Sequence, residues 1–185
     1  ETKGLKRKLL DSVEKFTYTL STKVYPNSFG LESIIHELNY AKNDKIKVIG
    51  KGSSNGINTL FFSREQVSNS VCQQVMIENS IDKKDFVFIF IGRIVNDKGI
   101  TELVSAFSNL SINYKNTKLL LVGNFEEDLD PLDTETHTLI NNHPNIQFAG
   151  YHQDVRPFLA TADVLVFPSY REGLPNVPLQ ACAME

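Results

Sequence analysis

The sequence has few cysteines and no long hydrophobic run, and each shortage excludes a class of protein. Its two cysteines, Cys72 and Cys182, lie far apart and lack the spacing of metal ligands, so we expect free thiols rather than a disulfide framework. No apolar run approaches the roughly 20 residues of a membrane-spanning helix, and the first residues do not read as a signal peptide. These features predict a cytoplasmic protein.

Positive charge is not in excess either. The formal net charge is −3 and the isoelectric point is near 5.8, which gives no general electrostatic basis for binding nucleic acid. Hydrophobic residues make up 41% of the chain and charged residues 22%, values that exclude a disordered or fibrous protein. Three histidines, His36, His137 and His143, show no metal-ligand spacing, and we predict no metal site.

The first third of the chain predicts a small α/β segment. Apolar residues at three- and four-residue spacing predict an N-terminal helix whose apolar face packs on its own domain. Its basic residues leave a second interpretation open, a helix that lies on anionic lipid. We further expect strands over 23–27 and 46–49 and a helix over 31–40. The apolar positions of the first helix are Leu5, Leu9, Val13, Phe16 and Leu20, its basic positions are Lys3, Lys6, Arg7 and Lys8, and the inward positions of the second helix are Leu31, Ile34, Ile35 and Leu38.

A run of glycine, serine and asparagine over 50–56 interrupts this pattern and predicts a linker. After it, strands and helices alternate, which predicts an α/β fold with parallel strands and helices on both faces. The run Phe86–Ile91 is the strongest strand, apolar on both faces like the centre of a parallel sheet. The other expected elements are helices over 67–77, 101–110, 134–142 and 155–161, strands over 118–122, 146–149 and 164–167, a loop over 123–132, and a terminal helix from Leu179.

The loop after the strongest strand carries two cations. Gly92 lets the backbone turn close to a ligand. Arg93 and Lys98 bracket the loop, and Gly99 opens the next helix. Two cations at the carboxyl end of a central strand suit a diphosphate, whose oxygens need neutralising charge and hydrogen-bond donors. A surface loop with two solvated cations is the alternative interpretation.

A carboxylate lies between the last predicted strand and the terminal helix. Glu172 precedes a glycine and a Pro-Asn turn. The amides of Leu174, Asn176 and Val177 would be free at a helix N-terminus, where phosphate binds well. The carboxylate could accept hydrogen bonds from sugar hydroxyls. We prefer this interpretation to a surface ion pair of Arg171 with Glu172, which would contribute little.

An aromatic residue and a histidine follow the strand over 146–149. Tyr151 and His152 form a candidate pocket for the base of a nucleotide. A lone histidine in such a loop is more often a surface residue, and this alternative stays open for His152. Asp154 is the expected N-cap of the helix that follows.

Four blocks in this order resemble a known family. The blocks are Gly92–Gly99, Leu119–Gly123, the stretch from Gly150 to Ser169, and Glu172–Val177. Together they closely resemble the retaining nucleotide-sugar glycosyltransferases of the "glycosyl transferases group 1" type, which have the GT-B fold. The resemblance covers residues 86–185 strongly and 53–57 more weakly, as an inter-domain hinge. It implies that 1–55 are the C-terminal part of an acceptor-side Rossmann-like domain and that 56–185 are a donor-binding Rossmann-like domain.

The resemblance also implies roles for single residues. Arg93 and Lys98 would hold the donor diphosphate, and Glu172 is similar to the first glutamate of the family's Glu-x7-Glu motif. Gln180 stands where the second glutamate usually binds the ribose hydroxyls. Its amide carbonyl can accept from a hydroxyl but carries no charge. The remaining donor-binding positions are Gly92, Gly173, Leu174, Pro175, Asn176 and Val177.

The function implied by the resemblance is transfer of a sugar from a nucleoside diphosphate, expected to be UDP, to an acceptor hydroxyl with retention. It requires no metal cofactor. The implied partners are the nucleotide-sugar donor and a glycan or lipid-linked acceptor of bacterial polysaccharide biosynthesis, with a peripheral contact to the inner membrane face. Two alternatives remain. A nucleotide-sugar 2-epimerase would need a fuller acid/base set than His152 and Glu172, and a non-catalytic sugar-nucleotide-binding domain would show no turnover.

The two ends of the chain are unusual for a complete protein. Residue 1 is a glutamate rather than a methionine, and residue 185 falls inside a helix that has just begun. We therefore expect a fragment whose donor-binding domain is truncated at its C-terminus. By itself, such a fragment is expected to be inactive as an enzyme.

Overall fold

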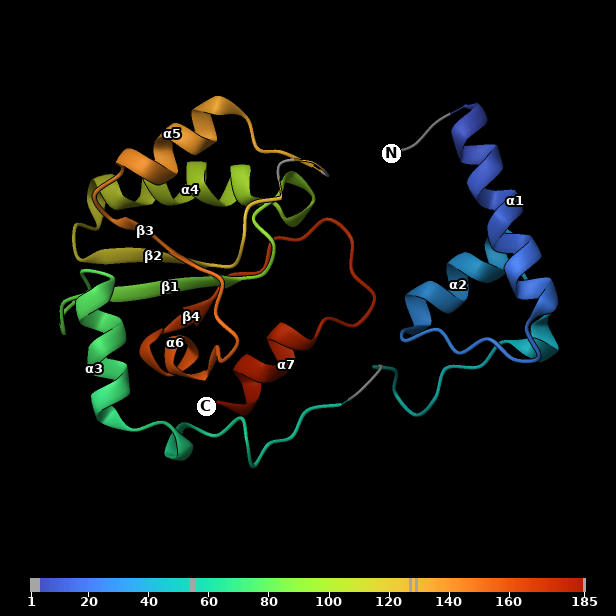
Figure 1. The fold of residues 1–185 in the computed structure, drawn as a ribbon, viewed down its shortest axis with the longest axis horizontal. Helices are drawn as coiled ribbons and strands as arrows, with labels where there is room; N and C mark the ends of the chain where they lie inside the picture. The colour runs from blue at the N-terminus through green and yellow to red at the C-terminus, as the bar shows by residue number, and fades with distance from the viewer. Residues whose placement is uncertain (1–3, 54–55, 127, 129, 185) are drawn as a thin grey trace. The chain divides into compact units, whose positions relative to one another are not determined.

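The computed structural model of the protein describes residues 4–53, 56–126, 128 and 130–184. The chain divides into two compact units (Figure 1). The first comprises Glu1–Gly56 with Gly173–Pro175, and the second comprises Ile57–Glu172 with Asn176–Glu185. Parts of two predictions, Ser54 and Asn55 of the linker and Lys3 of the basic run, lie outside the described residues.

Polar contacts hold the elements of the first unit together. Its elements are α1 (Leu5–Leu20), α2 (Phe29–Glu37) and the short 3-10 helix η1 (Asn43–Lys45). The ammonium group of Lys45 donates to the backbone carbonyls of Thr19, at 2.9 Å, and Ser21, at 2.8 Å. These contacts satisfy carbonyls at the C-terminal end of α1, which have no partner within the helix. The hydroxyl of Tyr40 donates to Asp11 in the middle of α1.

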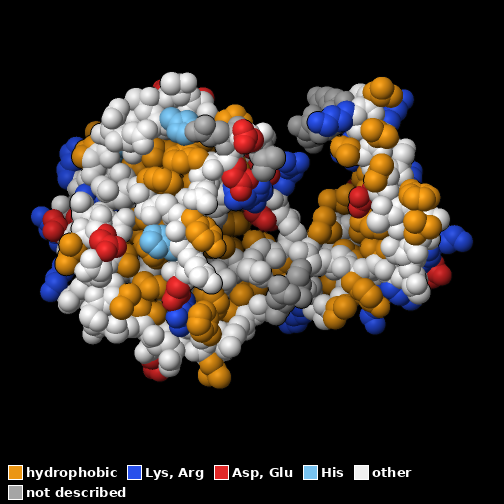
Figure 2. Space-filling view, in the orientation of Figure 1, with side chains coloured by type: hydrophobic (Ala, Val, Ile, Leu, Met, Phe, Trp, Pro, Cys, Tyr) orange, Lys and Arg blue, Asp and Glu red, His pale blue; other side chains and the backbone are white. Residues whose placement is uncertain are grey.

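The predicted burial of α1 is wrong. None of its described residues is buried, and the exposed fractions along the apolar stripe run from 54% at Val13 to 86% at Leu5. The reason is that α1 meets the segment after α2 through Arg7, Asp11 and Tyr18, on another side of the helix. In α2, Ile35 is buried as predicted, but Leu31, Ile34 and Leu38 are exposed. Figure 2 shows many hydrophobic side chains at the surface of this unit.

The two strands predicted in the first unit are also wrong. Each contributes a single residue to one parallel bridge, between Val24 and Ile46. The amide of Val24 donates to the carbonyl of Lys45 at 2.8 Å, and the amide of Lys47 donates to the carbonyl of Val24 at 3.1 Å. Pro26 follows two residues later and has no N–H to continue a ladder, so the pairing stops there.

A four-stranded parallel sheet forms the centre of the second unit. Its strands are β1 (Phe86–Ile91), β2 (Thr117–Val122), β3 (Ile146–Gly150) and β4 (Val164–Leu165), in the order β3-β2-β1-β4. The register of β1 on β2 runs from Phe86 opposite Thr117 to Ile91 opposite Val122. The sheet and the central place of β1 confirm the predicted fold class. The last strand ends two residues earlier than predicted, at Leu165.

Alternate residues of the central strands serve two hydrophobic cores, which explains the continuous apolar run. Val87, Ile89 and Ile91 belong to the core with α3 (Asn69–Glu78) and α6 (Arg156–Thr161), and α7 (Asn176–Ala183) packs against the same cluster. Phe90, with its neighbours Leu119 and Leu121 on β2, belongs to the core with α4 (Ile100–Asn113) and α5 (Thr134–Asn142). Figure 1 shows α4 and α5 on one face of the sheet and α3, α6 and α7 on the other. Both faces are therefore covered, as a parallel sheet requires.

The helices of the second unit occur where they were predicted, with bounds that differ from the predicted ones by up to three residues. Their bounds are α3 (Asn69–Glu78), α4 (Ile100–Asn113), α5 (Thr134–Asn142), α6 (Arg156–Thr161) and α7 (Asn176–Ala183), with 3-10 turns η2 (Arg64–Gln66) and η3 (Asn96–Lys98). The N-cap of α6 is Val155, so the prediction that Asp154 is the N-cap is wrong. Asp154 nevertheless accepts a hydrogen bond from the amide of Arg156 at 3.1 Å. Helix α7 begins three residues before the predicted Leu179.

His143, just after α5, has a structural role that predicts a pH-dependent stability. Its Nδ1 accepts from the amide of Asn145 at 3.1 Å, and its Nε2 lies 3.2 Å from the hydroxyl of Ser111. Burial first, and then the charge of Lys118, lowers the pKa of His143. The folded protein therefore holds fewer protons at this site than the unfolded chain when the pH is below the ordinary histidine pKa of 6.5.

We expect the free energy of unfolding to fall as the pH is lowered through 6.5, because protonation favours the unfolded chain. In the variant His143→Gln this contribution is absent, so its stability should depend less on pH. Urea unfolding of both proteins at pH 7.5 and pH 5.5 measures the difference. Equal losses of stability in the two proteins would contradict the assignment of the effect to His143.

Candidate functional site

Two loops meet at the carboxyl edge of the sheet, and a glycine makes their approach close. Gly99 has a φ of +69°, and a Cβ at this position would lie 2.4 Å from the backbone oxygen of Pro168. The loop after β1 therefore contacts the segment after β4. This approach needs a residue without a side chain and in a left-handed conformation. It brings Lys98 next to the segment that contains Glu172.

Lys98 and Glu172 form an ion pair across these loops. Lys98 is 14% exposed and Glu172 is 26% exposed. The hydroxyl of Ser169 donates to a carboxylate oxygen of Glu172 at 2.9 Å and lies 3.4 Å from the ammonium of Lys98. Lys98 and Glu172 are 74 positions apart in the sequence, and both were predicted to belong to the donor site. The structure brings them into direct contact. Ser169 lies in one of the family-like blocks, but no other feature of the sequence marked it as a site residue.

A second set of contacts fixes the Glu172 segment to the loop after β1. The carbonyl of Asp97 accepts from the amide of Tyr170 at 3.0 Å, and its carboxylate accepts from Nε of Arg171 at 2.8 Å. The hydroxyl of Tyr170 donates to Glu102 of α4 at 2.6 Å, and this hydrogen bond raises the pKa of the Tyr170 hydroxyl. The hydrogen bond from Arg171 is the main cause that lowers the pKa of Asp97. The charges of Lys98 and Arg93 lower that pKa further.

A cavity of about 310 Å³ lies at the same edge of the sheet, over the ends of β1 and β2. Its floor includes Gly92 and Gly123, where the backbones of the two strands approach closely. The amide of Gly92 donates to the carbonyl of Val122 at 2.9 Å. A Cβ on Gly123 would lie 1.8 Å from the carbonyl oxygen of Gly92. The lining residues are Ile91, Gly92, Arg93, Val122, Gly123, Asn124, Glu126, Tyr151, His152 and Val155.

Four of the predicted site residues therefore line one cavity: Gly92, Arg93, Tyr151 and His152. Tyr151 is 67% exposed. His152 is partly held by its surroundings, because its Nε2 donates to the carbonyl of Ala149 at 3.1 Å and its ring lies 4.3 Å from that of Phe158. His152 had been interpreted either as part of a pocket for the base or as a surface residue, and the structure shows features of both. Its ring packs on the fold and also contributes to the cavity wall.

The guanidinium of Arg93 donates to the carboxylate of Glu126 at 3.0 Å, and both side chains line this cavity. Sequence reasoning missed Glu126, which lay inside the predicted loop over 123–132. The sequence did contain a signal for Glu126, because this residue follows the second strand by a few positions. Residues that follow parallel strands gather at the carboxyl edge of the sheet, where the site lies. Residues 127 and 129 of the same loop lie outside the described residues.

The remaining predicted donor-binding residues are distributed over α7 and the segment before it. Asn176 and Val177 are the first residues of α7, and Val177 also packs against a hydrophobic core. Gln180 lies in the second turn of the helix. Gly173, Leu174 and Pro175 group with the first compact unit, so the site of the second unit consists of the other residues.

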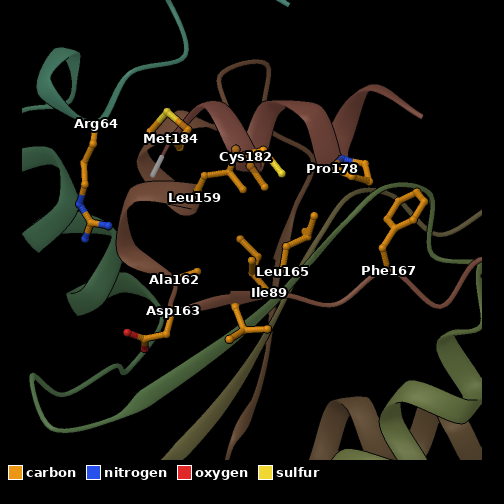
Figure 3. A pocket seen from close by; sticks show the side chains of 12 residues that line it. Arg64, Ile89, Leu159, Ala162, Asp163, Leu165, Phe167, Pro178, Cys182 and Met184 are labelled. Atoms are coloured by element: carbon orange, nitrogen blue, oxygen red, sulfur yellow. The ribbon is translucent and has the colours of Figure 1, made fainter. Parts of the chain in front are cut away.

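A second cavity, of about 390 Å³, lies between α6, α7 and β4 (Figure 3). Ile89, Leu159 and Leu165 line the middle of its wall, and Arg64 and Asp163 line one side. The carboxylate of Asp163 accepts from the amide of Val87 at 2.8 Å and so connects the start of β4 to β1. None of the predicted site residues lines this cavity.

Among the described residues there is neither a cluster of metal ligands nor a helix able to span a membrane. No group of three or more His, Cys, Asp or Glu side chains in this part of the chain is arranged to hold a metal ion. Over residues 4–53, 56–126, 128 and 130–184, no helix has both the length and the apolar character that crossing a membrane requires. Cys72 and Cys182 are both free.

Comparisons with known proteins agree with the fold and with the family-like blocks. The family described as "Glycosyl transferases group 1" matches residues 85–185. CapM of Staphylococcus aureus, a capsular polysaccharide biosynthesis glycosyltransferase, is 34% identical over 183 residues, which are 99% of this chain and 47% of CapM. An N,N'-diacetylbacillosaminyl-diphospho-undecaprenol alpha-1,3-N-acetylgalactosaminyltransferase of Campylobacter jejuni is 29% identical over 97% of this chain and 46% of its own length.

Among solved structures, HepE of Anabaena, in complex with UDP and glucose, has a TM-score of 0.75 with this chain. The two are 17% identical, and the match covers 96% of this chain and 46% of HepE. This similarity confirms the GT-B type of fold. The chain spans less than half the length of these three proteins.

The close approach at the cavity floor predicts that Gly123→Ala destabilises the protein. The added Cβ would overlap a backbone oxygen that cannot move without shifting β1, so we expect a loss of more than about 1 kcal/mol. Gly150→Ala is the matched control, because Gly150 also has a positive φ but its Cβ would meet no atom within 4 Å. Urea unfolding measures both variants. Equal losses would contradict the role of the Gly92–Gly123 contact.

Proposed function

Because this chain belongs to the Glycosyl transferases group 1 family, we propose that it binds a nucleoside-diphosphate sugar as the donor of a glycosyl transfer. One observation carries the proposal. At a single edge of the parallel sheet, Lys98 contacts Glu172, and Arg93 lines a cavity beside the same loop. Ligands of open parallel sheets bind at this edge. The arrangement offers cations for a diphosphate and a held carboxylate for a sugar.

Transfer of a hexose from UDP with retained configuration is the reaction that we propose in detail. The UDP and glucose in the complex of HepE support UDP as the nucleotide. The acceptor we propose is a growing capsular or other bacterial surface glycan. Support for it comes from the capsular polysaccharide role in the name of CapM and from the lipid-linked substrate in the name of the Campylobacter enzyme.

The proposed mechanism uses electrostatic stabilisation of the leaving diphosphate. Breaking the bond to the sugar places negative charge on the diphosphate, and preorganised donors stabilise that charge more in the transition state than in the ground state. Arg93, Lys98 and the N-terminus of α7 would be these donors, without a metal. Removing one such donor is expected to cost about 2–4 kcal/mol of transition-state stabilisation.

Glu172 would position the sugar or stabilise developing positive charge at the anomeric carbon, rather than act as a nucleophile. Its contacts with Lys98 and Ser169 support a fixed orientation of the carboxylate. The reaction would then proceed by displacement on the face from which the diphosphate departs. Retention can be tested by following the anomeric configuration of the first-formed product by NMR, and an inverted product would exclude this mechanism.

Binding of a nucleotide is the first expectation to test. We predict that UDP binds to the chain saturably and that Arg93→Ala weakens this binding by about tenfold or more, because one charge-assisted hydrogen bond is worth about 1.5–3 kcal/mol. Isothermal titration calorimetry with UDP, GDP and ADP measures the affinities and identifies the preferred base.

Lys84→Ala is the control, since Lys84 is exposed in the turn before the opposite end of β1. It should bind UDP as the wild type does. Absence of binding by all three nucleotides, or wild-type affinity in Arg93→Ala, would refute the donor site. Because the chain by itself is expected to be inactive as an enzyme, turnover is assayed in a protein that contains both GT-B domains. There, conversion of the UDP-sugar without an acceptor would indicate the epimerase, and binding without turnover would indicate a non-catalytic domain.

We also infer a cytoplasmic location with a peripheral contact to the inner membrane face, where lipid-linked acceptors are found. Helix α1 supports this proposal, because its exposed apolar stripe and the exposed Lys6, Arg7 and Lys8 have the composition of an interfacial helix. The wild-type chain should co-sediment with vesicles that contain anionic lipid, and the variant Phe16→Glu should not. Failure of the wild type to sediment would mean that protein, not lipid, covers the stripe.

A further inference from the structure

Each cation of the proposed donor site has a carboxylate partner within the protein. Lys98 is paired with Glu172, and Arg93 is paired with Glu126. The two pairs differ in their surroundings, because Lys98 is 14% exposed whereas Arg93 is 50% exposed. Glu172 already has a proposed role toward the sugar. The role of Glu126 is not explained by the transfer reaction.

The position of Glu126 is fixed by the fold. Its neighbour Phe125 forms a parallel bridge with Ile94, whose amide donates to the carbonyl of Asn124 at 2.8 Å. The ring of Phe125 lies 4.8 Å from that of His137 and 4.7 Å from that of Phe148. The backbone of the loop after β2 is therefore joined to the loop after β1 immediately beside Arg93 and Glu126. These contacts fix the backbone next to Glu126, and the side chain of Glu126 lines the cavity.

The ion pair between Arg93 and Glu126 adds little to the stability of the fold. The side chain of Arg93 is 50% exposed and that of Glu126 is 32% exposed, so water and salt screen their attraction, and such ion pairs contribute little to stability. Toward an anionic ligand the same carboxylate has a clear effect. It engages the guanidinium that would bind the phosphate, and it places a negative charge beside the phosphate oxygens.

We propose that Glu126 is a specificity-determining residue of the donor site that competes with the diphosphate for Arg93. This inference rests on the proposed function. The competition lowers the affinity for nucleotide, favours ligands with enough charge to displace the carboxylate, and assists release of the nucleoside diphosphate after transfer. Glu126 acts on the ligand through Arg93 and through its own charge, and it takes no part in bond breaking.

The test is calorimetric titration of UDP into the wild type and the variants Glu126→Gln, Arg93→Ala and the double variant. We expect Glu126→Gln to bind UDP about three- to tenfold more tightly, which corresponds to about 0.6–1.4 kcal/mol. The gain should be smaller in the Arg93→Ala background, because the competition for the guanidinium no longer exists there. It should also shrink at high salt, which screens exposed charges.

Two controls isolate the effect. Glu135→Gln removes the same charge from an exposed position on α5 that does not line the cavity, and it should leave the UDP affinity unchanged. Uridine, which lacks phosphate, should bind the wild type and Glu126→Gln equally. Equal unfolding midpoints in urea for the wild type and Glu126→Gln verify that the variant is folded, and Glu126→Ala serves as a second variant.

The outcomes separate this inference from the proposed function. If the wild type binds no nucleotide, both fail. If Arg93→Ala loses binding while Glu126→Gln binds as the wild type does, the donor site stands and the competition is refuted. Weaker binding by Glu126→Gln would also refute it, because Glu126 would then contact the ligand itself. An equal gain with and without Arg93 would show that Glu126 does not act through the guanidinium.

Discussion

The ion pair between Lys98 and Glu172 is the interaction on which the site depends. It joins the loop after β1 to the segment after β4, and the hydrogen bonds of Asp97 and Tyr170 hold the same two segments together. The pair forms because β1 and β4 are adjacent and parallel, so that their carboxyl ends reach the same edge of the sheet. The unsubstituted backbone at Gly99 then permits the close approach at Pro168.

The parts of the fold that could be predicted are those in which local pattern and tertiary burial agree. The run Phe86–Ile91 is apolar on both faces, and each face contacts a separate core, so its bounds match the prediction. The start of α7 was missed because Asn176 and Pro178 are typical of a turn. Proline is nevertheless tolerated in the first turn of a helix, where its missing N–H would have no partner within the helix. The same pattern therefore allows two starts.

The parts that could not be predicted depend on contacts that leave no periodic signal. The spacing of apolar residues in α1 predicts an apolar stripe, but it does not specify which surface, if any, covers that stripe. The strand pattern around Val24 was locally correct, but a strand needs a partner ladder, and one bridge is all that Pro26 leaves. At the site, the positions of Arg93 and Lys98 followed from the strand before them. Glu126 also follows a strand, but its place beside Arg93 depends on the bridge between Phe125 and Ile94, which the sequence pattern does not specify.

The proposed donor site combines fixed and exchangeable contacts. Glu172 is held by Lys98 and Ser169, whereas Arg93 and Glu126 form an exposed pair that a stronger anion can separate. The most direct test of this account is a crystal structure of the chain grown with UDP. The account predicts that the diphosphate lies at the carboxyl edge of the sheet, within hydrogen-bond distance of Arg93 and Lys98. A diphosphate out of reach of both cations, for example in the cavity between α6, α7 and β4, would contradict it.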